Sequence, residues 1–357
     1  MSWSPSSLLV TGGAGFIGSN FIRWVMGREA EVEVVTLDAL TYAGHRVSLD
    51  DLPDPSRHTF VEGDVADADL VERLLREHDV DLVVHFAAES HVDRSIHGPA
   101  AFVHANVEGT FGVLEAARRA WAGRSDVRLH HISTDEVYGS LGPEDPAFTE
   151  TTPYDPSSPY SATKAASDHL VRAYGRTYGL PVSITNCSNN YGPYQLPEKL
   201  IPLTIRRALA GAPVPIYGDG QQVRDWLYVE DHCEAIWRVA TEAPPGSTYN
   251  VGGDNQPTNL DLVRTLCGIL DDRRPEGAPH DRHLTFVADR PGHDRRYAMD
   301  LTAIGRDLGW HPRRSLADGL AETVDWYLRH GDWVDAVAEG GDLAGWMATQ
   351  YEAPRSA

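Results

Sequence analysis

Two neighbouring carboxyl groups raise the question of what the chain does. The stretch ISTDEVYG (132–139) begins as an apolar run that ends at Thr134, and Asp135 and Glu136 follow directly. Carboxylates without a partner are costly to bury, so the pair either caps a solvated turn or belongs to a catalytic site. Burial and adjacency push the pKa values of two carboxyl groups apart. In a site, such a pair could supply one protonated acid and one ionised base.

A tyrosine and a lysine form a second candidate for chemistry. YSATK (160–164) places Tyr160 and Lys164 four residues apart, and on a helix such residues share one face. The ammonium group would lower the pKa of the phenol by favouring the phenolate. Tyr160 would then act as a base toward a substrate hydroxyl. The same spacing occurs on many solvated helices, so it indicates function only together with other motifs.

A glycine-rich turn near the start predicts a dinucleotide site. LLVTGGAGFIGSNFIRWV (8–25) reads as a strand, a turn and a helix, with Gly12, Gly15 and Gly18 in the spacing G-x-x-G-x-x-G. Glycine lets the backbone approach a pyrophosphate, which the free N–H groups of the helix start then bind. Asp38 closes the second strand 20 residues after Gly18, where its carboxylate would bind the adenosine ribose. It would repel a 2′-phosphate, which favours NAD over NADP; the alternative is an ordinary turn beside a strand-end aspartate.

Two further strand ends carry weaker signals. Asp64, in GDV (63–65), could meet the adenine amino group or could equally cap the helix that follows. FAAES (86–90) ends the fourth strand in small residues, which would leave room for a cofactor. Small residues also serve close helix packing, so this stretch indicates a site only in combination with the others.

The elements that must position these groups alternate along the first half of the chain. Helical patterns at 69–78 and 106–121 predict βαβ units around a buried parallel sheet. We therefore expect an α/β fold with a doubly wound parallel sheet of the Rossmann type. From about residue 190, clusters of Pro, Gly and Asn predict a smaller mixed α/β lobe. The expected strands are 8–12, 32–38, 59–65, 81–88, 128–133 and 181–188.

Charge and composition exclude some functions. The 31 Lys and Arg residues against 52 Asp and Glu give a net charge of −21, which opposes binding to nucleic acid or to an anionic membrane. No apolar run approaches the ~20 residues of a membrane span, and the start, MSWSPSSLLVTGG, does not read as a signal peptide. Cys187, Cys233 and Cys267 are widely spaced, which indicates a reducing cytoplasm and no metal site.

Long motifs identify a family. TGGAGFIG, the strand-end ST and YSATK together resemble the extended short-chain dehydrogenase/reductase superfamily. Within it, TDEVYG, AAESHVDRS, CSNNYGPYQ, PEKLIPL, VRDWLYVEDH and DRPGHDRRYAMD resemble the nucleotide-hexose 4,6-dehydratases, most closely those that act on dTDP-glucose. The resemblance runs from about Leu8 to about Arg329. Epimerases of the superfamily usually carry small residues where Asp135 and Glu136 follow the threonine here.

The resemblance implies a reaction and roles for five residues. Tyr160, helped by Lys164 and Thr134, would take the proton of the sugar 4-hydroxyl while NAD⁺ accepts the C4 hydride. Glu136 would remove the C5 proton, which the new ketone acidifies, and a protonated Asp135 would donate to the departing 6-hydroxyl. Return of the hydride to C6 completes the loss of water. The expected product is a 4-keto-6-deoxy sugar.

The resemblance also implies binding residues, with no metal. For NAD these are Gly12, Gly15, Phe16, Ile17, Gly18, Asp38, Thr41, Asp64, Val65, Ala87, Ser90, Tyr160, Lys164 and Asn190. For the nucleotide sugar they are Ser90, Asn189, Lys199, Leu200, Tyr217, Arg224, Asn259, Arg290 and His293. The basic members would form the local pocket that an anionic substrate needs on an acidic chain. Relatives usually carry Thr before the helix Asn106, so Ala105 removes one hydroxyl contact to the cofactor.

The expected organisation follows the same resemblance. Residues 1–187, rejoined by part of 225–255, would form the NAD-binding domain, and 188–330 the nucleotide-sugar lobe. The extension 331–357 shows only weak helical character, and we expect its last residues to be disordered. Helices near 99–121 and 160–178 would form the four-helix interface of a homodimer. The alternatives are another nucleotide-sugar dehydratase or epimerase, or an inactive NAD-binding regulator; intact catalytic residues argue against the regulator.

Overall fold

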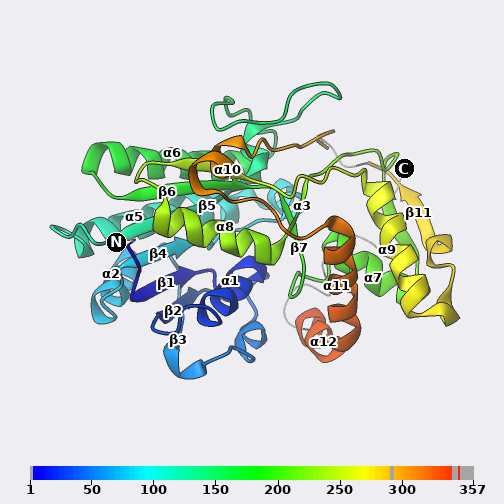
Figure 1. Cartoon of the computed structure of the whole chain (residues 1–357), viewed down its shortest axis with the longest axis horizontal. Helices are drawn as coiled ribbons and strands as arrows, with labels where there is room; N and C mark the ends of the chain where they lie inside the picture. Colours follow the sequence, from blue (N-terminus) through cyan, green and yellow to red (C-terminus); the bar gives the residue numbers. More distant parts are fainter. Residues whose placement is uncertain (1–2, 290–292, 340–344, 346–357) are drawn as a thin grey trace.

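A seven-stranded parallel sheet organises the chain (Figure 1). The computed structural model describes residues 3–289, 293–339 and 345. Its strand order is β10-β6-β5-β4-β1-β2-β3, and every neighbouring pair is parallel. This confirms the predicted doubly wound α/β fold. The strands are β1 (Ser7–Thr11), β2 (Glu33–Asp38), β3 (His58–Glu62), β4 (Leu82–His85), β5 (Arg128–Thr134), β6 (Val182–Cys187) and β10 (Thr248–Val251).

Helices cover both faces of the sheet because its strands are apolar on both sides. In β1, Leu8 and Val10 point into the apolar core on one face and Leu9 into the core on the other, as the two-residue period of a strand requires. The first core is shared with α1 (Phe16–Met26), α8 (Val229–Glu242) and α10 (Thr302–Leu308). The second is shared with α2 (Ala68–Glu77), α5 (Gly109–Ala120) and α6 (Pro159–Tyr178).

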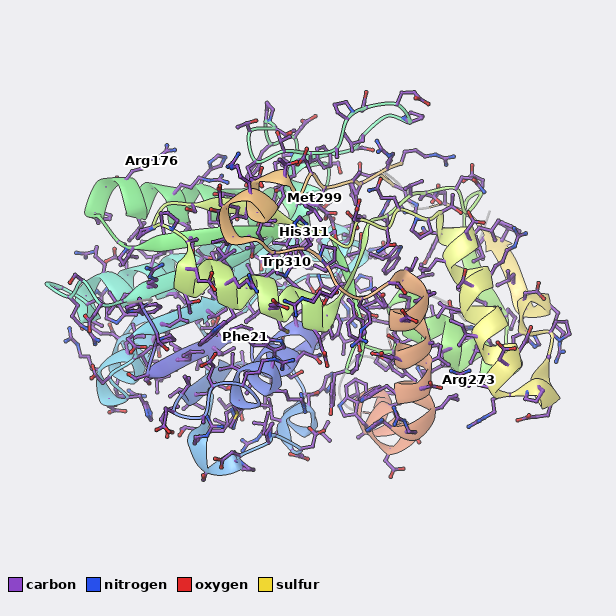
Figure 2. All side chains as sticks on the ribbon, in the orientation of Figure 1. Phe21, Arg176, Arg273, Met299, Trp310 and His311 are labelled. Atoms are coloured by element: carbon purple, nitrogen blue, oxygen red, sulfur yellow. The ribbon has the colours of Figure 1, made fainter. Side chains whose placement is uncertain are left out.

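Figure 2 shows the same separation of inside and outside through single side chains. Phe21 and Trp310 are buried among the elements around the sheet, with 0% and 1% of their surface exposed. Arg176 and Arg273 lie on the outside of the molecule. Among the described residues, no helix is long and apolar enough to cross a membrane.

A smaller lobe lies beside the sheet, to the right in Figure 1. It contains two short parallel pairs, β8 (Val214–Tyr217) with β11 (Leu284–Val287) and β7 (Asn189–Tyr191) with β9 (Trp226–Tyr228). Residues of α7, α9, α11 and α12 share its apolar core. The chain leaves the sheet after β6 and returns to it with α8 and β10. The lobe helices are α7 (Leu200–Leu209), α9 (Asn259–Arg273), α11 (Leu316–Arg329) and α12 (Gly331–Glu339).

Helix α12 forms the start of the extension after Arg329. The sequence predicts only weak helical character after Arg329, and 331–339 forms a helix. Trp333, Val334 and Val337 are buried in the lobe core, and the Trp333 indole donates a hydrogen bond to Ser48 Oγ at 3.2 Å. Tertiary packing of this apolar face stabilises a helix that is marginal by itself. The end of the predicted extension, beyond residue 345, lies outside the described residues.

Short helical segments fill several connections of the chain. The sequence from 92 to 108 forms three such segments in succession before α5 begins. These segments are α3 (Val92–His97), α4 (Pro99–Phe102), the π-helical η3 (Val103–Glu108), and the 3₁₀ segments η1 (Arg46–Leu49), η2 (Pro55–Arg57), η4 (Asp135–Tyr138), η5 (Pro275–Gly277) and η6 (His280–His283).

Candidate active site

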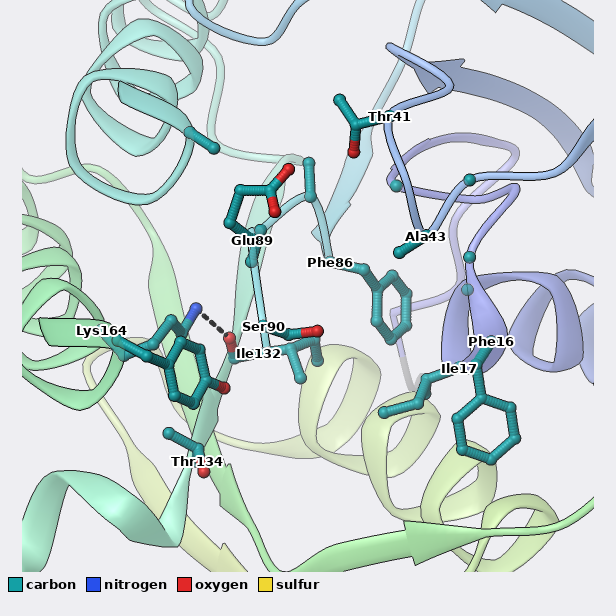
Figure 3. Close-up of a pocket in the computed structure, with 18 of the residues that line it drawn as sticks. Phe16, Ile17, Thr41, Ala43, Phe86, Glu89, Ser90, Ile132, Thr134 and Lys164 are labelled. Atoms are coloured by element: carbon teal, nitrogen blue, oxygen red, sulfur yellow. Dashed lines mark hydrogen bonds between the residues drawn. The ribbon is translucent and has the colours of Figure 1, made fainter. Parts of the chain in front are cut away.

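Two adjoining cavities open where the strand order reverses. The first, of about 440 Å³, runs along the carboxyl ends of β1, β2, β4 and β5 (Figure 3). The second, of about 470 Å³, continues between the sheet and the smaller lobe. Ligands of open α/β sheets bind at such a switch point. The residues that line both cavities are Ser90, Glu136, Asn189, Asn190, Gln195 and Lys199.

The glycine-rich turn forms one end of the first cavity. Gly12 has a φ of +70°, and a Cβ there would lie 2.6 Å from the backbone nitrogen of Ala87. A Cβ at Gly18 would lie 2.4 Å from the Gly12 carbonyl, so both positions exclude a side chain. Helix α1 then begins at Phe16 with Gly15 as its N-cap and no capping side chain. The turn thus offers backbone and the start of a helix to the cavity, which fits a pyrophosphate.

Asp38 stands at the end of β2, buried at the wall of the same cavity. The backbone N–H of Leu40 donates to its Oδ1 at 2.8 Å, and that of Ala14 donates to its Oδ2 at 2.9 Å. Burial raises the pKa of this carboxyl group, against the lowering effect of the two backbone bonds. The bonds fix the carboxylate beside the glycine turn, where the sequence predicts the ribose.

Asp64 does not cap the following helix, which excludes one of its two interpretations. Asp67 is the N-cap of α2 and accepts from the backbone N–H of Leu70 at 3.0 Å. Asp64 instead accepts from the backbone N–H of Ala66 at 2.8 Å and lies 2.8 Å from His104 Nε2. It lines the first cavity, as Ala105 does. Its contact with adenine stays a prediction.

The acid pair, the tyrosine and the lysine meet in the first cavity. Thr134 ends β5, and η4 turns Asp135 and Glu136 toward the cavity. Helix α6 starts with the Ser158–Ser161 capping box, which sets Tyr160 and Lys164 in its first two turns. Because a parallel sheet aligns its carboxyl ends, elements far apart in sequence deliver these groups to one place.

Thr134 contacts both members of the acid pair. Its hydroxyl donates to Asp135 Oδ1 at 3.2 Å. The backbone N–H of Glu136 donates to the same hydroxyl at 3.3 Å. One small residue therefore holds the side chain of Asp135 and the backbone of Glu136 in the cavity that Tyr160 also lines.

Asp135 is set up to be protonated. It is only 2% exposed, and its Oδ2 has no hydrogen-bond partner among the described residues. Burial, followed by the charges of Glu136 and Asp225, raises the pKa of Asp135 well above its ordinary value. Glu136 is half-buried and lines both cavities. The two neighbours thus differ in environment, as an acid and a base in one site require.

Lys164 makes its hydrogen bonds to strand β5. Its Nζ donates to the Ile132 carbonyl at 2.7 Å (Figure 3), and burial lowers its pKa to about 8. Burial, then the Glu136 carboxylate, raises the pKa of Tyr160 well above its ordinary value. The expected lowering of the phenol pKa is therefore wrong for the protein groups by themselves.

The second cavity gathers the residues expected at the nucleotide sugar. Arg224 is fixed by hydrogen bonds from its guanidinium to the carbonyls of Val223 and Asp294, both at 2.8 Å. Arg290 lies outside the described residues. The other expected residues all line this cavity: Ser90, Asn189, Lys199, Leu200, Tyr217, Arg224, Asn259 and His293.

Some lining residues escaped the sequence analysis. Gln195 lines both cavities, and Tyr297 lines the second, where its ring lies 4.3 Å from the Arg224 guanidinium. Both residues fall inside motifs that carry the family resemblance, which is the signal that could have found them. Every residue expected at the cofactor lines the first cavity.

Fold and site define a short-chain dehydrogenase/reductase type of enzyme that acts on nucleotide sugars. The family described as GDP-mannose 4,6 dehydratase matches residues 9–323. The dTDP-glucose 4,6-dehydratase 1 of Escherichia coli (strain K12) is 53% identical over 97% of this chain and 99% of its own length. The chain therefore belongs to the GDP-mannose 4,6 dehydratase family and, within it, to the dTDP-glucose 4,6-dehydratases.

Two further relatives agree with this assignment. The dTDP-glucose 4,6-dehydratase of Xanthomonas campestris pv. campestris (strain B100) is 57% identical, covering 93% of this chain and 96% of its own. The crystal structure of DesIV, a dTDP-glucose 4,6-dehydratase from Streptomyces venezuelae with NAD and TYD bound, has a TM-score of 0.84 and 50% identity. The match covers 93% of this chain and 99% of the DesIV chain. The resemblance inferred from the motifs is confirmed.

Proposed function

We propose that the chain is an NAD-dependent dehydratase that converts dTDP-glucose to dTDP-4-keto-6-deoxyglucose with loss of water. The observation that carries this proposal is the acid pair Asp135 and Glu136, which lines the first cavity together with Tyr160 and Lys164. Oxidation of a sugar hydroxyl needs a base such as tyrosine, and elimination of water needs an acid and a second base. The names of the family members support the same substrate and cofactor.

The first cavity is where the cofactor would bind, in a domain made of 1–187 and part of 225–255. The glycine turn would face its pyrophosphate, and Asp38 its adenosine ribose. When bound, NAD⁺ accepts the hydride of C4, returns it to C6, and adds a positive charge that favours the Tyr160 phenolate. The lobe 188–330 would hold the nucleotide sugar.

The residues of the chain then divide the proton transfers. Tyr160 takes the proton of the 4-hydroxyl, with the help of the cationic Lys164 one turn later on α6 and of Thr134 in the same cavity. The 4-ketone acidifies the neighbouring C5 proton, which Glu136 removes and later returns. Asp135, protonated because it is buried, donates to the departing 6-hydroxyl. The different environments of Asp135 and Glu136 thus suit one to act as the acid and the other as the base.

Basic and aromatic groups of the second cavity would hold the nucleotide. Lys199, Arg224 and His293 bring positive charge to the cavity, where they would bind the diphosphate. Tyr217 and Asn259 would contact the nucleoside and Asn189 the sugar end; we propose Arg290 as a further diphosphate contact. These charges give an acidic chain of net charge −21 a local site for an anion.

We also propose a homodimer in the cytoplasm. Phe111 on α5 and Tyr178 at the end of α6 are 49% and 57% exposed, and Val103 on η3 is 45% exposed. Large exposed apolar side chains on these elements support an interface, and these are the helices expected in the four-helix contact. The three cysteines are free and buried, which supports a reducing compartment.

The decisive experiment incubates the purified protein, with no added cofactor, with dTDP-glucose and separately with UDP-glucose. The 4-keto sugar is followed by its alkaline ultraviolet absorbance. We expect product from dTDP-glucose alone, and none from the Tyr160→Phe variant prepared in the same way. Product from UDP-glucose would point to a different dehydratase, and a 4-epimer without loss of water would point to an epimerase. Bound NAD with no turnover of either sugar would point to a regulator.

A further inference from the structure

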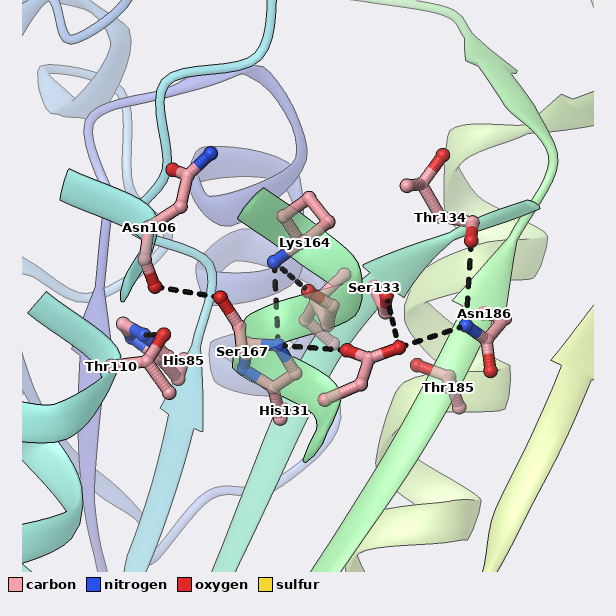
Figure 4. Close-up of polar contacts among 12 residues, drawn as sticks. His85, Asn106, Thr110, His131, Ser133, Thr134, Lys164, Ser167, Thr185 and Asn186 are labelled. Carbon is pink, nitrogen blue, oxygen red and sulfur yellow. Dashed lines mark hydrogen bonds and ion pairs between the residues drawn. The ribbon is translucent and has the colours of Figure 1, made fainter. Parts of the chain in front are cut away.

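A buried carboxylate, Asp168, belongs to the polar network around Lys164 and His131; Figure 4 shows Lys164 and His131 with their contacts. It follows Lys164 by four residues on α6, and its side chain is completely buried. Its Oδ2 accepts three hydrogen bonds, from Ser133 Oγ at 2.8 Å, Tyr154 OH at 2.7 Å and Asn186 Nδ2 at 3.3 Å. Three donors on one oxygen hold the carboxylate in a fixed orientation and keep it ionised.

The other oxygen of Asp168 faces His131, which also contacts the lysine. Oδ1 has no hydrogen-bond donor among the described residues and lies 3.3 Å from His131 Nε2. The same nitrogen lies 3.3 Å from Lys164 Nζ. His131 and Ser133 project from the same face of β5, because they are two residues apart. The imidazole therefore stands between an ammonium group and a carboxylate, within reach of both.

The buried ammonium group of Lys164 needs a negative counter-charge. Lys164 is only 4% exposed, and burial disfavours its charged form. Asp168 is the group that most strongly opposes this effect, followed by Cys187. Cys187 is a neutral thiol, because burial raises its pKa to about 12. Asp168 thus supplies the ionised counter-charge of the buried ammonium.

The other titratable groups around the pair do not replace Asp168. Burial lowers the pKa of His131 to about 4, and lowers that of His85, whose ring lies 5.3 Å from the His131 ring. Both imidazoles are therefore neutral at pH 7. Arg172, whose Nη2 donates to Tyr154 OH at 2.7 Å, adds positive charge and cannot serve as a counter-ion.

We infer that Asp168 is a positioning residue for the proposed reaction: it supplies the buried negative charge that keeps Lys164 cationic and oriented behind Tyr160. A carboxylate with a purely structural role would be expected to saturate both of its oxygens. In Asp168, Oδ2 accepts the hydrogen bonds from Ser133 and Tyr154, and Oδ1 lies 3.3 Å from His131 Nε2. The inference rests on the role proposed for Lys164 in the dehydration.

The composition of the chain makes a direct test possible. The sequence contains two lysines, Lys164 and Lys199. In the full-length protein labelled with ¹³Cε-lysine, NMR therefore shows two side-chain signals, and the Lys199→Arg variant assigns the one that remains to Lys164. We expect this signal to titrate near pH 8 in the wild-type protein. The titration needs no substrate, so its failure is separate from failure of the proposed function, which turnover of dTDP-glucose tests.

The Asp168→Asn variant should lower the Lys164 midpoint by about one pH unit or more, a tenfold loss of proton affinity. Asp168→Glu should restore most of the shift because it returns the charge. Tyr154→Phe is the matched control, since it removes one hydrogen bond from Asp168 Oδ2 but leaves the carboxylate in place; its midpoint should stay at the wild-type value. Circular dichroism verifies that each variant is folded.

Two results would overturn the inference. A folded Asp168→Asn protein with the wild-type midpoint would show that the carboxylate only supports the fold. An equal shift in Tyr154→Phe would assign the effect to packing rather than to charge. If Asp168→Asn does not fold, Asp168→Glu decides the matter, because it keeps the negative charge and should hold the midpoint near the wild-type value. A midpoint lowered by one pH unit or more in folded Asp168→Glu would contradict the role of the charge.

Discussion

Replacing Asp135 by Asn separates the acid step from everything that precedes it. Asn has the same shape and can still accept the hydrogen bond that Thr134 donates to Oδ1, but it does not release a proton. Loss of a positioned general acid costs roughly 10²- to 10⁴-fold in rate, or about 3–5 kcal/mol in the barrier. Since Tyr160 and Lys164 are untouched, C4 oxidation should continue. The reduced cofactor should accumulate while formation of the keto sugar falls by that factor.

The same variant has a stability signature that follows from the burial of Asp135. Its pKa in the folded chain is raised, whereas in the unfolded chain it is about 3.9. Between these two values the native state holds one proton more than the unfolded state. The wild-type protein therefore loses about 1.4 kcal/mol of stability per pH unit relative to Asp135→Asn as the pH rises through this window.

Urea denaturation of both proteins at several pH values measures this difference, because groups common to both, such as Asp225, cancel to first order. A stopped-flow trace of cofactor absorbance after mixing with dTDP-glucose measures the rates. A difference in unfolding free energy that stays constant with pH would mean that Asp135 is ionised in the folded protein. Wild-type dehydration by the variant would refute its role as the acid. The proton-donor assignment requires both expected results.

Three further predictions follow from the site and the surface. Glu136→Gln should remove the C5 base but leave C4 oxidation possible, so reduced cofactor should build up in a single turnover; dehydration at the normal rate would contradict that role. Tyr160→Phe should slow the first oxidation itself, seen as a slow rise of the same absorbance, and wild-type turnover would exclude it as the base. Phe111→Glu should convert the dimer to a monomer in light scattering, whereas Phe286→Glu, on the exposed strand β11, should not; equal masses for both variants would place the interface elsewhere.

Local patterns in the sequence predicted most of the fold. The alternation of short apolar runs with helical segments predicted the sheet, because strands buried on both faces must be apolar throughout. The strand at 128–133 and the helix carrying Tyr160 appear as β5 and α6. Glycine spacing located the turn. A Cβ at Gly12 would lie 2.6 Å from the backbone nitrogen of Ala87, so no other residue fits there. Such signals are local, so the sequence alone contains them.

Contacts between distant segments needed the tertiary structure. The i, i+4 spacing placed Tyr160 and Lys164 on one face, but it could not show that the Lys164 ammonium binds the Ile132 carbonyl. Helix α12 forms because Trp333 finds an apolar core, and its own sequence is only weakly helical.

The sequence by itself determined which groups can do chemistry and how strands and helices alternate along the chain. The tertiary structure decided their protonation. The pKa of Asp135 is raised and that of Lys164 lowered by burial among residues that are remote in sequence. Desolvation depends on everything that surrounds a group, and no local pattern encodes those surroundings.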